Sequence, residues 1–121
     1  MSKAADDALR LQVAKLCGWT QIQPPETAFE RKLCHMWEAD LMGRDATGCA
    51  APVPNYATDL NAMHKAEHLV RRDEQTNSRY ERHLRAVMAA ADAGRCNRRI
   101  QFAEARERAQ AFVLAMGDKA T

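Results

Sequence analysis

Hydrophobic residues recur every three to four positions along most of this chain, the spacing that places them on one face of an α-helix. The clearest case begins after Thr27, which can cap a helix, with Glu30 three residues later to complete a capping box. Gly43 follows as a stop signal. The pattern therefore predicts a helix between Thr27 and Gly43, with its apolar face formed by Phe29, Leu33, Met36, Trp37 and Leu41.

Four further segments show the same periodicity and are predicted to be helical. In chain order they run from Asp6 to Cys17, from Thr58 or Asp59 to about Arg72, from Asn77 or Ser78 to Gly94, and from about Ala103 to Met116. Ser78 and Glu81 spell a second capping box at the start of the fourth expected helix. Glycines at 18 and 117 follow the first and the last helix as stop signals.

Short runs rich in strand formers lie between these helices. Residues 19–23, WTQIQ, are cut off by two prolines, and residues 48–53, GCAAPV, can hold a short edge strand. A further short extended piece is expected at 99–102. The chain is therefore predicted to be a single domain, residues 1–121, of the mostly α class with a small β component (α+β). We expect a compact helical domain of four to five helices with a short two- or three-stranded sheet.

The same periodicity gives an expected core, because large apolar residues at helical spacing usually face the interior. Cys17 and Cys34 lie on apolar faces and are interpreted as small buried hydrophobic residues. The other residues expected to be largely buried are Phe29, Leu33, Trp37, Leu41, Leu84, Val87, Phe112 and Val113.

Charge and hydropathy exclude several classes of protein. The chain has 18 Lys and Arg against 16 Asp and Glu, so its net charge of +2 argues against bulk binding of nucleic acid. No stretch approaches the roughly 18 continuous apolar residues of a membrane helix. The first residues carry Asp6 and Asp7 and lack the apolar core of a secretion signal. We expect a cytoplasmic protein with no membrane partner.

One short motif suggests chemistry. Residues 64–68, HKAEH, match the H-x-x-E-H spelling of the inverted zinc proteases. His64 and His68 would share one helix face, but a zinc site needs a third protein ligand, and no second motif supplies one. The chain also has no glycine-rich phosphate loop, no G-x-S-x-G and no C-x-x-C. We therefore interpret the motif as a polar helix edge and expect no enzyme, no metal, no cofactor and no catalytic residue.

Arginine is concentrated in the C-terminal half. Arg79, Arg82 and Arg85 recur every three residues and would line one flank of the fourth expected helix, and Arg95, Arg98 and Arg99 follow in the next loop. Such a surface could bind carboxylates or phosphates. The alternative is a solvated face with interspersed salt bridges. These six arginines are the candidate binding residues.

Three segments carry a resemblance to a known family. Residues 52–70, PVPNYATDLNAMHKAEHLV, contain a proline-rich loop, an aromatic residue and a Thr-Asp pair that opens a helix. Residues 8–19 and 105–117 are similar to an opening helix that ends in Gly-Trp and to a closing helix. In this order they resemble the small phage and prophage proteins of the phage alpha-beta-alpha sandwich family. The resemblance implies a protein made in the cytoplasm of an infected bacterium. It transfers no catalytic residue, because the family has none established.

These observations favour a non-enzymatic phage or prophage accessory protein that binds a host protein or nucleoprotein complex. A candidate role is an anti-defence inhibitor, similar in kind to an anti-CRISPR, or another host modulator. The alternative is a nucleic-acid or nucleotide-binding protein that uses the arginine-rich half. Binding that falls steeply with salt would favour the alternative. The sequence does not set the oligomeric state.

Overall fold

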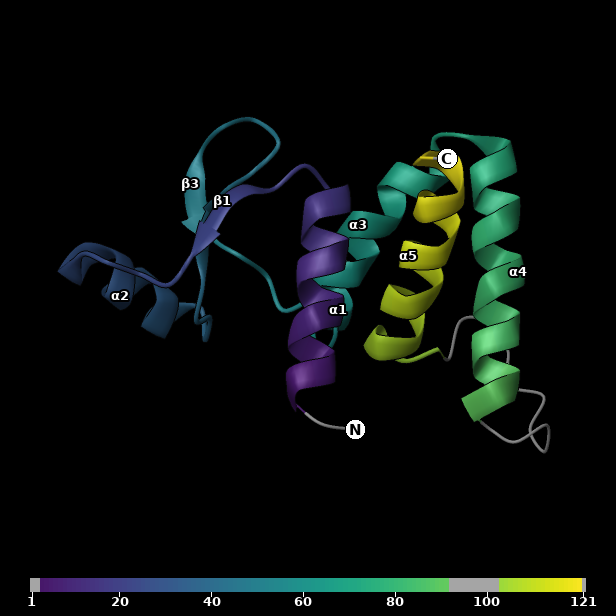
Figure 1. Ribbon diagram of the computed structural model, residues 1–121, viewed down its shortest axis with the longest axis horizontal. Coiled ribbons are helices and arrows are strands. Elements are labelled where there is room, and N and C mark those ends of the chain that lie inside the picture. The colour runs from purple at the N-terminus through teal and green to yellow at the C-terminus, as the bar shows by residue number, and fades with distance from the viewer. Residues whose placement is uncertain (1–2, 92–102, 121) are drawn as a thin grey trace.

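The computed structural model describes residues 3–91 and 103–120. Within these ranges the chain is an α+β protein with five helices and a three-stranded antiparallel sheet (Figure 1), which confirms the predicted class. The helices are α1 (Lys3–Leu16), α2 (Ala28–Met36), α3 (Leu60–Arg71), α4 (Glu74–Ala91) and α5 (Ala105–Ala120). The strands are β1 (Thr20–Gln23), β2 (Met42–Arg44) and β3 (Ala50–Pro52).

Helices α1, α3, α4 and α5 form a bundle with α5 at its centre. This helix packs against α1, α3 and α4, and α3 also packs against α4 (Figure 1). Ala109, Ala111 and Ala115 of α5 are fully buried, and their small side chains allow the neighbouring helices to approach closely. Phe112 fills the space between them, and Leu84 of α4 is buried with it. The prediction of burial is confirmed for these two residues.

The remaining elements form a lobe beside the bundle, which we define as residues 20–52. It contains β1, α2, β2 and β3 and lies at the left of Figure 1, next to α1. The strand order is β1-β2-β3, and Met42 pairs with Pro52 and Arg44 with Ala50. The strands expected from residues 19–23 and 48–53 are therefore both present, and β3 lies at an edge of the sheet as expected.

Helix α2 begins where the sequence predicts. Thr27 accepts a hydrogen bond from the backbone N–H of Glu30, and the Glu30 side chain accepts one from the backbone of Thr27, so the capping box is complete. The predicted end at Gly43 is wrong, because the helix stops at Met36. Residues 42–44, at the end of the expected helix, instead form β2.

The early end of α2 is a Schellman motif. The backbone N–H of Ala39 donates to the carbonyl of Cys34 at 2.7 Å, and that of Glu38 donates to the carbonyl of His35 at 3.2 Å. This motif needs a left-handed residue just after the helix, and Glu38 takes that place with φ 52°. Glutamate gives no sequence signal for such a position, which glycine usually occupies.

Two residues expected in the core lie at the surface. Phe29 is 69% exposed and Trp37 is 71% exposed, so the prediction that they are buried is wrong. The cause is the place of α2, which packs against β3 and not against the bundle helices. Of the other residues expected to be buried, Cys34 is buried, whereas Cys17, Leu33, Leu41, Val87 and Val113 are half-buried.

The starts of α3 and α4 test two other predictions. Asp59 caps α3 as predicted, since its side chain accepts from the backbone N–H groups of Asn61 and Ala62. Helix α4 begins at Glu74 and not at Asn77 or Ser78, so the second predicted capping box is wrong. Asp73 takes part in the observed start, because its carboxylate accepts from the Thr76 hydroxyl at 2.5 Å.

Helix α5 starts near the expected position but continues past Gly117 to Ala120. The predicted stop at this glycine is therefore wrong. Glycine permits the left-handed conformation that ends a helix but does not require it, and Gly117 is not among the residues with positive φ. The expected extended piece at 99–102 and the stop at Gly94 lie outside the described residues.

Helix α1 ends in the same Schellman geometry as α2, with Gly18 at φ 96° in place of Glu38. We expect Gly18→Ala to lower the free energy of unfolding by about 1–2 kcal/mol, because an L residue is strained at positive φ. Its Cβ would also lie only 2.9 Å from that of Ala46. Glu38→Gly should raise stability by about 0.5 kcal/mol, since relief of strain exceeds the added entropy of the unfolded chain. Urea denaturation followed by circular dichroism measures both changes in stability. If both substitutions changed stability in the same direction, the assignment of the two left-handed positions would be contradicted.

Candidate functional site

A surface groove lies between the lobe and the first turn of α3. Its volume is about 900 Å³. Trp37, at the end of α2, and Trp19, just before β1, line it together with Pro52 and Pro54. Leu60 and other residues of α3 form the opposite side. The groove therefore combines flat aromatic and proline surfaces from three separate segments, opposite α3.

A buried arginine holds the proline segment of the groove in place. Arg10 of α1 is only 2% exposed. Its Nη2 donates to the carbonyl of Val53 at 2.6 Å and its Nε to the carbonyl of Pro54 at 3.2 Å. Its Nη1 also donates to the carboxylate of Asp40, which lies between α2 and β2. One side chain of the bundle thus fixes the groove and the lobe at once.

A second contact joins the chain segments just before and just after the lobe. Trp19 Nε1 donates to the hydroxyl of Tyr56 at 3.0 Å, across 37 positions of sequence. Tyr56 is buried, and burial raises the pKa of its phenol, so the group stays protonated. This hydrogen bond fixes the indole of Trp19 where it lines the groove.

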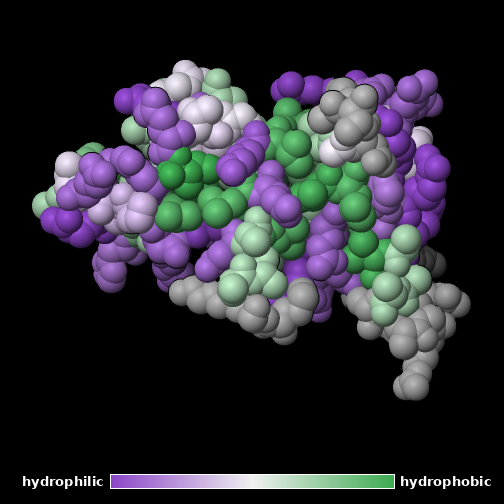
Figure 2. Space-filling model, in the orientation of Figure 1, coloured by the Kyte–Doolittle hydropathy of each residue, from purple (hydrophilic) through white to green (hydrophobic). Residues whose placement is uncertain are grey.

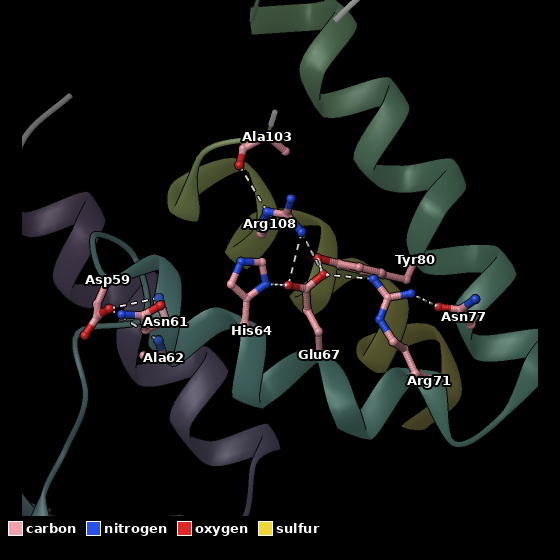
Figure 3. Close-up of polar contacts among 10 residues, drawn as sticks. All are labelled: Asp59, Asn61, Ala62, His64, Glu67, Arg71, Asn77, Tyr80, Ala103 and Arg108. Carbon is pink, nitrogen blue, oxygen red and sulfur yellow. Dashed lines mark hydrogen bonds and ion pairs between the residues drawn. The ribbon is translucent and has the colours of Figure 1, made fainter. Parts of the chain in front are cut away.

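The groove carries more acidic than basic groups. Its lining includes the carboxylates of Glu38, Asp45 and Asp59 and one ammonium, that of Lys65. The hydroxyl of Thr47 donates to Asp45, and with backbone N–H groups of the β2–β3 turn this lowers the pKa of Asp45. Asp59 uses Oδ1 to cap α3, as Figure 3 shows.

The exposed face of α2 lies beside this groove. Phe29, Met36 and Trp37 are 69%, 66% and 71% exposed, and their spacing places them on one side of the helix. Leu60, across the groove, is 41% exposed. We call these four residues the α2 surface. In Figure 2 the strongly hydrophobic residues of this face run from the inner side of the lobe across the bundle, inside a largely polar outline.

The arginines predicted as binding residues are only partly brought together. Arg82 and Arg85 of α4 are exposed. Arg79 is half-buried and its Nη2 donates to the Thr76 hydroxyl at 3.3 Å, so it is held against its own helix. Arg95, Arg98 and Arg99 lie outside the described residues. The described part of this candidate surface is therefore two exposed arginines one turn apart.

Other arginines of the basic half have structural contacts. Arg106 of α5 donates from Nε and Nη2 to the two oxygens of Asp6 at 2.8 and 2.7 Å, which joins α5 to α1. This hydrogen bonding lowers the pKa of Asp6. Arg108 of α5 is buried and donates to Glu67 of α3, as Figure 3 shows. Counting arginines along the sequence therefore overstates the free positive charge of this half.

The HKAEH motif is built around a buried carboxylate. Glu67 is 2% exposed, and Figure 3 shows donors from three helices converging on it. Arg108 Nη1 donates to both oxygens at 2.9 and 3.1 Å, and the Tyr80 hydroxyl donates at 2.8 Å. Arg71 Nη2 lies at 3.4 Å and His64 Nδ1 at 3.1 Å. Burial raises the pKa of Tyr80, which keeps the phenol a donor.

The prediction of a polar helix edge is therefore only partly right. His64 and His68 are exposed, but Glu67 between them is buried and binds side chains of the core. A signal for this was present in the sequence: Glu67 lies four residues after Met63 and three before Val70, on the apolar face of α3. Its oxygens are occupied by the cations and hydroxyl that bind it, which leaves it poorly placed to act on a substrate.

Cys17 and Cys34 are poorly suited to nucleophilic chemistry. Burial raises the pKa of the Cys17 thiol to about 11 and also raises that of Cys34. Cys34 Sγ lies 3.8 Å from the carbonyl of Leu41. Cys49 is exposed on the β2–β3 turn, and Cys96 lies outside the described ranges.

Two features that often indicate a function are absent from residues 3–91 and 103–120. In these ranges no three His, Cys, Asp or Glu side chains are grouped as metal ligands would be. No helix in the same ranges has the length and apolar character needed to cross a membrane. Comparison with known proteins adds no assignment: no family model matches the chain, and no curated protein and no solved structure matches it either. The resemblance to phage proteins stays a prediction.

Proposed function

We propose that this protein is a non-enzymatic binding protein and that it recognises a partner protein through the α2 surface and the adjoining groove. The observation that carries the proposal is the exposure of Phe29, Met36 and Trp37 on one face of a single helix. Single exposed apolar residues are common, but a contiguous apolar patch on a soluble protein often marks an interaction site.

The residue types support the same conclusion. Aromatic residues and methionine are enriched in protein interfaces, and tryptophan is among the residues that contribute most to binding energy. Trp37 belongs to both the α2 surface and the groove, so a partner that covers the helix would also reach the groove. Arg10 and the Trp19–Tyr56 hydrogen bond fix this region before binding, which limits the ordering cost.

The partner that we propose is a host protein or nucleoprotein complex in a bacterial cytoplasm. The resemblance of residues 52–70 to small phage proteins supports this setting. A phage accessory protein that covers a functional surface of a defence complex, or otherwise modulates a host protein, is the specific form of the proposal.

A second candidate is nucleic-acid binding through the basic flank of α4. Arg82 and Arg85 are exposed one turn apart, a spacing at which both could reach phosphates. The groove is acidic and lies between the lobe and α3, away from Arg82 and Arg85 of α4, so the two candidates use different surfaces. They can therefore be separated by substitution.

The test compares two double variants of the full chain. Phe29→Ala with Trp37→Ala removes the centre of the α2 surface, and Arg82→Gln with Arg85→Gln removes the basic flank. We expect a protein captured by the wild type from bacterial lysate to be reduced at least tenfold by the first variant and retained by the second. Circular dichroism melts should show both variants folded, because all four side chains are exposed.

The opposite pattern would contradict the proposal. Capture that is lost with the arginine variant, is abolished by nuclease and falls steeply with salt would favour nucleic-acid binding. Capture that is unchanged in both variants would exclude both surfaces.

A further inference from the structure

Both tryptophans of the chain line the groove. Indole rings offer a broad flat face that attracts cations, and guanidinium groups stack on such faces more often than ammonium groups do. Trp37 is largely exposed, so its ring is accessible from solvent. The aromatic part of the groove is therefore suited to an arginine or lysine side chain.

The charged groups of the groove favour the same ligand. Glu38, Asp45 and Asp59 oppose only Lys65, although the chain as a whole carries a net charge of +2. The three carboxylates come from the end of α2, the β2–β3 turn and the cap of α3, which surround the groove on different sides. Carboxylates near an aromatic face can pair with a guanidinium that stacks on it.

The floor of the groove determines how a peptide could lie there. Ala51 and residues 52–55, PVPN, contribute to it, and Pro52 and Pro54 have no backbone N–H to pair with an added strand. The backbone N–H of Val53 is already bound to the carbonyl of Leu41. A ligand would therefore be recognised through side chains, as extended peptides are in grooves lined by aromatic residues.

From these observations we infer that the groove binds an extended, basic segment of a partner protein, with arginine or lysine side chains placed over the tryptophans and between the three carboxylates. This inference rests on the proposed function and names the chemistry of the partner. The cavity volume of about 900 Å³ is near the upper end of the range for ligand sites, which is enough for several side chains.

The test uses the intrinsic fluorescence of the two tryptophans, since both lie in the groove. The probe is the peptide acetyl-Arg-Pro-Arg-Pro-Arg-Pro-amide, which lacks aromatic residues and favours an extended conformation. Matched peptides carry Gln or Glu in place of Arg. We expect a saturable change in emission with the Arg peptide, at least tenfold weaker binding of the Gln peptide and none of the Glu peptide. Titration of free N-acetyltryptophanamide corrects for collisional quenching.

Charge variants then locate the site. Glu38→Gln with Asp59→Asn should weaken binding of the Arg peptide at least fivefold, and Asn preserves the cap of α3. Asp45 is left unchanged because its carboxylate closes the β2–β3 turn. The matched control, Glu74→Gln with Glu81→Gln, changes net charge equally on α4 and should alter binding less than twofold. Circular dichroism checks that both variants are folded.

Absence of a saturable change with the Arg peptide would overturn the inference, as would equal weakening by the α4 control, which would indicate general charge attraction. These outcomes are separate from those of the capture experiment. Partner capture that depends on Phe29 and Trp37, without peptide binding, would retain the proposed function and reject the basic ligand. Peptide binding without such capture would retain the site and reject that function.

Discussion

Replacing Glu67 by alanine should lower the free energy of unfolding by about 3–5 kcal/mol, the cost of leaving one member of a buried ion pair without its partner. Arg108 is 4% exposed and donates to both oxygens of Glu67. The Tyr80 hydroxyl would lose its acceptor as well. Urea denaturation followed by far-ultraviolet circular dichroism measures the change.

Two control variants make this result specific. Glu67→Leu with Arg108→Leu removes both charges and should recover most of the loss, because a buried ion pair contributes little beyond an apolar pair of similar size. His64→Ala removes a half-exposed donor and should cost less than about 1 kcal/mol, because Glu67 keeps Arg108 and Tyr80 as partners. A loss below about 1 kcal/mol for Glu67→Ala would show that water replaces the missing carboxylate.

Arg10→Met should destabilise the protein by about 2–4 kcal/mol, because it removes a buried cation that satisfies two carbonyl groups and one carboxylate. The carbonyls of Val53 and Pro54 would lose these donors, and Asp40 would lose its ion pair. The loss should be measured by urea denaturation. It should be accompanied by a shift in tryptophan emission, because Trp19 and Trp37 line the groove that Arg10 supports.

The appropriate comparison for Arg10 is Arg106→Met, which removes the other arginine–aspartate pair that involves α1. Arg106 is 32% exposed against 2% for Arg10, so the loss of stability should be smaller, and tryptophan emission should not change. Equal effects of the two substitutions would contradict a special role of Arg10 in supporting the lobe. An unshifted emission spectrum in Arg10→Met would contradict its role at the groove.

Local sequence signals predicted most of the elements of this fold. The capping box at Thr27, the cap at Asp59 and the stop at Gly18 depend on residues close in sequence, and each is present in the structure. The end of α2 could not be predicted in this way. It depends on Glu38 in a left-handed conformation, which residues other than glycine rarely adopt. No neighbouring residue signals this conformation.

The position of α2 shows a second limit. Its periodicity correctly identified which side of the helix is apolar, but burial depends on what lies opposite that side. Phe29 and Trp37 are exposed because the lobe places α2 away from the bundle. An amphipathic pattern cannot distinguish a face that meets its own chain from one left free for another molecule.

The buried charges show a third limit, because their partners are distant in sequence. Arg10 and Asp40 are 30 positions apart, and Glu67 and Arg108 are 41. Spacing within a helix could have indicated that Glu67 faces inward, but not which cation it meets. For the same reason the groove was missed, since its two tryptophans and three carboxylates come from different parts of the chain.

The Trp19–Tyr56 hydrogen bond has a consequence for how this chain can change over time. It joins the chain just before the lobe to the chain just after it. The lobe is therefore a long connection between α1 and α3 whose two ends lie close together beside the helical bundle. The entropy cost of closing such a loop rises only slowly, by about 0.6 kcal/mol for each doubling of its length. Residues can therefore be added to or removed from the lobe at little thermodynamic cost, provided that Asp40 and residues 53–54 still contact Arg10. The part of the protein that we propose to face a partner can therefore diverge in length and sequence while the four helices that carry it remain the same.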